Sequence, residues 1–150
     1  MNSNEKCVNR DTARKLNEEG FPQDTERWWQ RFDTNPELFQ RSEASEDGWC
    51  LQDYISDDAL DTTAAPDAQE IGALLPTIVK EKDGRKLYLS FSRVAGRGIR
   101  KGTLIWHVFF VWHDWDNKKT YVHTHGNFLD ENEAEARAAM WLWLKEQKLL

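Results

Sequence analysis

Residues 103–150 read TLIWHVFFVWHDWDNKKTYVHTHGNFLDENEAEARAAMWLWLKEQKLL, and this stretch decides the fold. From 103 to 113 almost every residue is apolar, which is typical of a central strand whose two faces are both covered by other elements. A polar turn over 114–118 leads into a second strand over 119–125. The sequence therefore predicts an antiparallel strand pair at the centre of the protein.

Cap and turn signals place the remaining elements around this pair. Asp130 and Glu133 match a capping box, so we expect a helix that ends near residue 147. Residues 26–32 fit either a strand or a helical turn, and a strand is preferred. The other expected elements are a helix from Asn9 or Asp11 to Glu19 that Gly20 ends, a polar acidic loop over 33–61 with one short strand at 49–55, a helix from Pro66 to 75, and strands at 78–81 and 86–94 joined at Asp83-Gly84.

These elements define the expected fold class. The chain of 150 residues has the usual size of one domain and needs neither disulfides nor metal to form a core. We predict a single α+β domain with a mainly antiparallel sheet, formed by 86–94, 103–113 and 119–125. Two or three helices cover this sheet, which gives two to three layers.

Cysteine content and hydropathy bear on the cell compartment. The chain has only two cysteines, Cys7 and Cys50, no CxxC motif and no leader of the secretory type. A reducing cytoplasm fits this pattern, and membrane insertion is not expected because no apolar run approaches about 18 residues. We therefore expect a cytoplasmic protein.

Charge is distributed unevenly along the chain. The formal net charge is −6, yet residues 77–119 contain 10 basic and 4 acidic residues. We call residues 77–119 the basic island. Such asymmetry is typical of a surface for nucleic acid or for an acidic protein, although solvated strands also produce it.

The best candidate binding site lies in the basic island. Residues 95–102 combine three glycines with cations, and glycine lets backbone amides approach an anion. The spacing is neither a Walker A loop nor a dinucleotide fingerprint, and a solvated hairpin loop remains the alternative. Together with an aromatic residue at a turn, which can anchor an interface, the candidate macromolecule-binding residues are Arg93, Arg97, Arg100, Lys101 and Trp115.

Catalytic and metal sites are less well supported. No nucleophile motif or catalytic triad is recognisable, so enzyme activity is not expected, and no cofactor is predicted. Histidines at odd positions in two paired strands could share a face and bind a metal if the turn centres on Asp116. The candidates for such a site are His107, His123 and His125, and a register slip of one residue would separate them.

Three segments resemble small phage and prophage proteins. They are TARKLNEEGF at 12–21, APDAQ at 65–69 and the closing helix at 133–150. In that group, found in Bacteroides-type phages and mobile elements, an opening helix, an APTQ-type helix start and a closing EEA helix follow in the same order. The match covers roughly a third of the chain and consists of caps and packing stripes, which carry fold but no chemistry. The resemblance implies a phage or prophage origin and no particular activity.

The sequence thus predicts a non-catalytic interaction protein that binds a host or phage macromolecule. A protein partner is the first expectation. The alternatives are a nucleic-acid-binding accessory protein that uses the loop at 95–102 and, further off, a histidine metal site. The pattern does not decide the oligomeric state.

Overall fold

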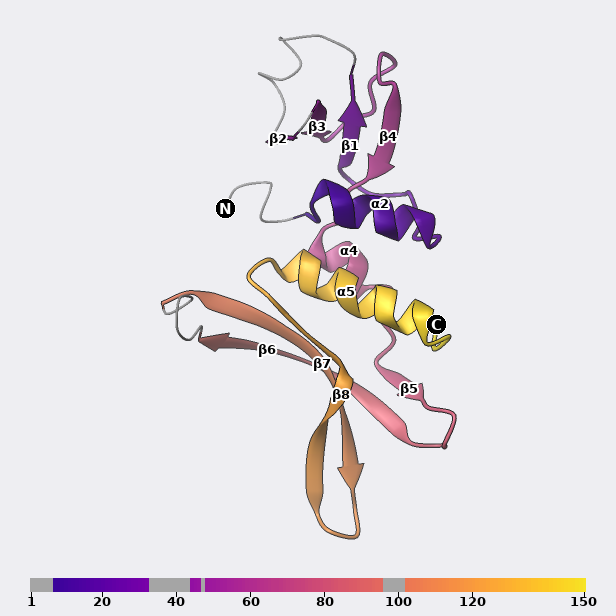
Figure 1. Cartoon of the computed structure of the whole chain (residues 1–150), viewed down its shortest axis with the longest axis vertical. Helices are drawn as coiled ribbons and strands as arrows, with labels where there is room; N and C mark the ends of the chain where they lie inside the picture. Colours follow the sequence, from indigo (N-terminus) through magenta and orange to yellow (C-terminus); the bar gives the residue numbers. More distant parts are fainter. Residues whose placement is uncertain (1–6, 33–43, 47, 96–101) are drawn as a thin grey trace.

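The computed structural model describes residues 7–32, 44–46, 48–95 and 102–150 (Figure 1). Within these residues, three helices and eight strands follow one another along the chain. They are α2 (Arg10–Glu18), β1 (Trp28–Arg31), β2 (Ala44–Glu46), β3 (Trp49–Gln52), β4 (Asp61–Ala64), α4 (Ala68–Gly72), β5 (Ile78–Lys80), β6 (Lys86–Ala95), β7 (Leu104–Asp114), β8 (Lys119–Asp130) and α5 (Glu133–Glu146). None of these helices is long and apolar enough to cross a membrane.

The strands form two antiparallel sheets with the helices between them. The small sheet has the order β2-β3-β1-β4, and the large sheet has the order β5-β6-β7-β8. From top to bottom, Figure 1 shows the small sheet, α2, α5 with α4 beside it, and the large sheet. The α+β class is confirmed, and the expected central strands are β6, β7 and β8 of the large sheet.

Helix α5 supplies core residues to both halves of the protein. On one side, the Trp141 ring meets the Phe21 ring edge-on, with centroids 5.1 Å apart. On the side of the large sheet, the Trp143 ring lies 6.1 Å from that of Phe110 on β7. The helix is therefore apolar on two sides because α2 and the large sheet cover opposite sides of it.

Helix α5 covers one face of β7, and on the opposite face of this strand only Ile105, at 7% exposure, is buried. Val108 and Phe110 are buried beneath α5. On the other face, His107, Phe109 and Val111 remain partly exposed, and no described helix or strand packs on them. The prediction that both faces are covered is therefore wrong for residues 107–111, because the described helices lie on one side of the large sheet.

A bulge interrupts the pairing of β7 with β8. Phe109 pairs with Asn127 and Val111 with Val122, so the four residues from His123 to Gly126 oppose Phe110 alone. A bulge bends a sheet and increases its local twist. Accordingly, Figure 1 shows the β7–β8 hairpin turning away from the rest of the large sheet.

The two longer helices begin and end largely as their caps predict. Asn9 caps α2 through its side chain, which accepts from the Thr12 amide at 2.9 Å, and Gly20 follows with φ of 86°. For α5 the predicted cap is wrong. Asn132 rather than Asp130 accepts from the first turn, and the Asp130 carboxylate instead accepts from the Asn132 amide at 2.8 Å.

Helix α4 is shorter than the proline signal predicts. It begins at Ala68 because Asp67 is extended and its carboxylate caps the Glu70 amide at 2.8 Å. The Pro66 carbonyl accepts from the Val8 amide at 3.1 Å, so Pro66 belongs to an extended contact and not to the helix. The predicted start at Pro66 is therefore wrong by two residues.

The small sheet was not predicted. Residues 44–46 form a strand within the segment 33–61 that was expected to be mostly loop, and 61–64 form another where no element was expected, while 49–52 and 28–31 match expected strands. Residues 33–43 of that segment lie outside the described residues. A buried amide holds this sheet together, because the Gln30 Nε2 donates to the Gln52 Oε1 at 2.7 Å.

Candidate binding surface

The outer face is the side of the large sheet that points away from α5. Successive side chains of a strand point to opposite faces, so the core residues Leu87, Val108 and Phe110 mark the inner side. The pairing register extends this assignment to every strand of the sheet. The outer face carries Ile78, Lys80, Lys86, Tyr88, Ser90, Ser92, Val94, Ile105, His107, Phe109, Val111, His113, Thr120, Val122, Asn127 and Leu129.

Ring side chains form a row along β7 on the outer face. The His107 imidazole stacks on Phe109 with centroids 4.2 Å apart and 27° between the planes. Towards the hairpin tip, the His113 ring lies 5.3 Å from Tyr88 and 4.8 Å from Trp115. The indole of Trp115 is 76% exposed. Because same-face positions on a strand are about 6.8 Å apart, the rings make a ridge along the strand.

Hydrogen-bonding side chains flank these rings. Ser92 pairs with His107, while Ser90 and Asn127 pair with Phe109 from the two neighbouring strands. The His107 Nε2 is buried and has no hydrogen-bond partner, and burial lowers the pKa of this imidazole. The ring row therefore lies between groups that can donate and accept hydrogen bonds.

The strand positions of the outer face carry positive charge only. Lys80 and Lys86 pair across β5 and β6, and both are exposed. None of the outer-face strand positions that the structure describes is Asp or Glu. Of the basic residues of the basic island, Lys80 and Lys86 are the ones that the structure places on the outer face, and these two favour an anionic partner.

Aliphatic side chains surround the ring row and are left in water. Their exposed fractions are 53% for Ile78, 36% for Val94, 49% for Val122 and 53% for Leu129. Neighbouring apolar residues that stay exposed on one face are typical of an interaction site.

The structure does not gather the site residues predicted from the sequence. Arg93 points to the inner side, where its guanidinium lies 4.2 Å above the Trp106 ring. Trp115 follows the opposite end of β7, about 30 Å away along an extended strand. The remaining candidates, Arg97, Arg100 and Lys101, lie outside the described residues. Of the described candidates, only Trp115 adjoins the outer face.

Sequence reasoning missed several residues of the outer face, among them Tyr88, His113 and the two lysines. A signal for them exists in the alternation of residues 86–90. Leu87 and Leu89 pack towards the core, which leaves Lys86, Tyr88 and Ser90 on the opposite face.

The histidines do not adopt the register that a shared metal site requires. His107 pairs with Leu129 and not with His125, and His113 pairs with Thr120. The hairpin near its tip is offset by one residue from the expected register, and the bulge adds a further shift. Among the described residues, one group of side chains lies close enough together to hold a metal ion, and it contains no histidine.

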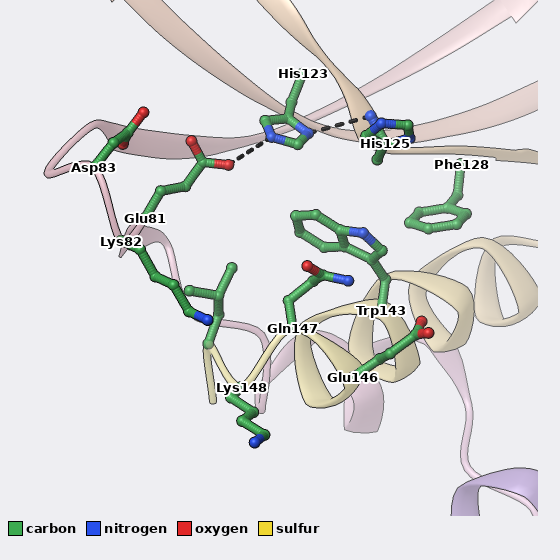
Figure 2. Close-up of a pocket in the computed structure, with 11 residues that line it drawn as sticks. Glu81, Lys82, Asp83, His123, His125, Phe128, Trp143, Glu146, Gln147 and Lys148 are labelled. Atoms are coloured by element: carbon green, nitrogen blue, oxygen red, sulfur yellow. Dashed lines mark hydrogen bonds and ion pairs between the residues drawn. The ribbon is translucent and has the colours of Figure 1, made fainter.

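Two histidines, His123 and His125, line a cleft of about 910 Å³ between the β5–β6 turn, the β8 bulge and the end of α5 (Figure 2). The His123 Nε2 lies 2.7 Å from a Glu81 carboxylate oxygen, and its Nδ1 accepts from the Gly126 amide at 2.8 Å and the His125 amide at 3.2 Å. These partners assign the Nε2–H tautomer. Both nitrogens are thus used within the protein, so this imidazole shapes the bulge and offers no lone pair to a substrate or metal.

The metal-compatible group consists of Glu26, Asp67 and Glu70, whose oxygens lie within 4.8 Å of one another. Asp67 is the cap of α4, and a Glu70 oxygen accepts from the Glu26 amide at 3.2 Å. Burial raises the pKa of Glu70. Helix capping and one loop contact therefore account for this group without a cation.

Comparison with known proteins adds no further constraint. No protein-family model, curated protein or solved structure matches the chain.

Proposed function

We propose that the protein is a non-catalytic interaction protein that binds a macromolecule through the outer face of the large sheet. The observation that carries this proposal is the row of ring and aliphatic side chains on which no described helix or strand packs. Burying apolar surface stabilises a complex by about 25 cal/mol per Å², so binding of a partner that covers this row is favourable.

The chemistry of the cleft supports a non-catalytic role. The Glu81–His123 pair has the composition of an acid–base pair, yet its imidazole is fully engaged by internal hydrogen bonds. A general base needs a nitrogen within reach of the substrate proton. Phage or prophage origin forms part of the proposal through the resemblance of the opening and closing helices.

The experiment that tests this function is capture from a bacterial lysate, with and without nuclease, by the immobilised protein. The outer-face variant is Val122→Glu/Leu129→Glu, which changes two half-exposed side chains. The matched control is Ile55→Glu/Leu60→Glu, whose side chains are 59% and 58% exposed and lie outside the large sheet.

We expect the wild type and the control to retain the same macromolecule and the outer-face variant to lose it. Thermal unfolding checks that both variants remain folded. Equal recovery by all three proteins would show that the outer face is not the binding surface.

A further inference from the structure

We infer that the partner of the outer face is a single-stranded nucleic acid, an inference that rests on the proposed function. Three features of the face carry it together: accessible rings, hydrogen-bonding groups beside them, and lysines without neighbouring strand carboxylates. Each feature matches one component of a nucleotide, namely the base, its edge and the phosphate.

The rings provide two positions at which bases can stack. One is the His107–Phe109 pair, and the other is the cluster of Tyr88, His113 and Trp115. Every base has a π-face, and stacking on an aromatic side chain contributes about 1–3 kcal/mol per base. In a duplex these faces are already stacked on neighbouring bases, so the ring row selects single strands.

Polar side chains lie beside the rings, where they would meet the edges of bases stacked on those rings. Ser90 and Asn127 lie on the two sides of Phe109, and Ser92 lies beside His107. The His113 Nδ1 is 2.9 Å from the Thr120 hydroxyl, which leaves the Nε2 for a ligand. The Ser90 and Ser92 hydroxyls can bond to base edges or to a ribose hydroxyl, whereas the Asn127 amide nitrogen already donates to the His123 and Thr124 carbonyls at 2.9 Å.

The charge of the face complements a phosphate backbone. Lys80 and Lys86 lie at the end of the sheet that carries Tyr88 and His113. The net charge of −6 arises from residues outside the basic island, and charges beyond about 8 Å are screened at physiological salt. Next to Trp115, the Asp114 carboxylate accepts from the Asn117 amide and side chain, so it serves the turn.

The positions of the aliphatic residues favour a nucleic acid over an apolar protein surface as the partner. Ile78, Val94, Val122 and Leu129 lie at the margins of the ring row, whereas the centre combines rings and Val111 with the Ser90 and Ser92 hydroxyls and Asn127. An interface with another protein usually has its most apolar part at the centre and a polar rim. On the outer face, polar side chains lie at the centre beside the rings, which favours bases over an apolar protein surface.

The test is fluorescence anisotropy with labelled oligothymidylate and oligouridylate of about 12 nucleotides, a length that spans a single-strand binding site. A duplex of the same length and polyglutamate are the competitors. Phe109→Leu removes a ring from the outer face, and Phe91→Leu, on the inner face of β6, is its matched control. Trp115→Ala is a second variant at a side chain so exposed that the fold does not depend on it.

We expect the wild type to bind the single strands and neither competitor to displace them. Phe109→Leu and Trp115→Ala should each weaken binding by about 5- to 150-fold, and Phe91→Leu should not. Replacing both lysines in Lys80→Gln/Lys86→Gln should reduce the slope of log K against log salt by about 1.4. Lys15→Gln/Lys148→Gln, at exposed lysines outside the large sheet, is the control for charge.

Three outcomes decide between this inference and the proposed function. If neither oligonucleotide binds, but a nuclease-resistant partner is retained by the wild type and lost by Val122→Glu/Leu129→Glu, the outer face binds a protein and the inference is wrong. If no variant of the outer face changes any binding, both are wrong. Displacement by polyglutamate as effective as by oligonucleotide would also overturn the inference, because charge alone would then explain binding.

Discussion

Gly126 closes the β8 bulge directly against the end of α5, and replacing it tests the packing described for the cleft. A Cβ at this position would lie 2.9 Å from Trp143 Cη2, 3.1 Å from Trp143 Cζ3 and 3.3 Å from His123 Nδ1. Neither ring can move freely, because Trp143 packs on Phe110 and His123 is bonded to Glu81. Overpacking of this kind costs about 1–3 kcal/mol.

Thermal and urea unfolding of Gly126→Ala measure this cost. For a chain of this length each kcal/mol lowers Tm by about 2–4 °C, so Tm should fall by about 2–12 °C. Trp143→Leu shortens the side chain that the new methyl group would meet. In that background Gly126→Ala should cost at least about 1 kcal/mol less, a coupling typical of residues in contact.

The double-mutant cycle also contains the result that would refute this reasoning. If Gly126→Ala costs the same with Trp143 and with Leu at that position, the methyl group does not meet the indole. The bulge would then have a different conformation from the one described.

Two further predictions concern buried polar groups. Burial raises the pKa of Glu135, whose carboxylate accepts from the Thr12 hydroxyl at 2.6 Å; the folded protein therefore holds this proton more tightly than the unfolded chain does. The stability that protonated Glu135 contributes is lost as the pH rises above the ordinary glutamate pKa of about 4.3. Urea titrations between pH 4 and 7 should therefore show that Glu135→Gln gains stability relative to wild type as the pH rises. A difference in stability that stays constant over this range would contradict the prediction. Gln30→Leu leaves the Gln52 side chain and the Ser56 amide without their hydrogen bonds of 2.7 Å. The free energy of unfolding should fall by about 1–3 kcal/mol for each of these groups. A fall below about 1 kcal/mol in total would show that water replaces the Gln30 amide.

The sequence predicts the long regular elements well because their signals are local. Gly20, with its positive φ, ends α2, and the turn at Asp83-Gly84 has its positive φ at Gly84. The apolar run of β7 identifies the central strand. Each of these signals depends on the conformation of a few neighbouring residues, which the chain itself encodes.

The small sheet and the outer face depend instead on contacts between distant segments. Strand β4 pairs with β1 through residues such as Thr63 and Trp29, yet its own sequence, DTTA, carries no strong strand pattern. The expected histidine register is wrong by one residue at the hairpin tip, and it is shifted further by the bulge at His123–Gly126, where His123 bonds to Glu81, 42 residues away. Propensity and alternation contain no information about such a bond.

The central position of α5 has a consequence for biosynthesis. Translation proceeds from the amino terminus, so both sheets emerge from the ribosome before the helix that lies between them. Leu87, Val108 and Phe110 cannot reach their final packing until α5 has been made. Nascent chains that stop before residue 133 should therefore expose apolar strands and bind chaperones, which makes completion of this helix the step that commits the polypeptide to its native state.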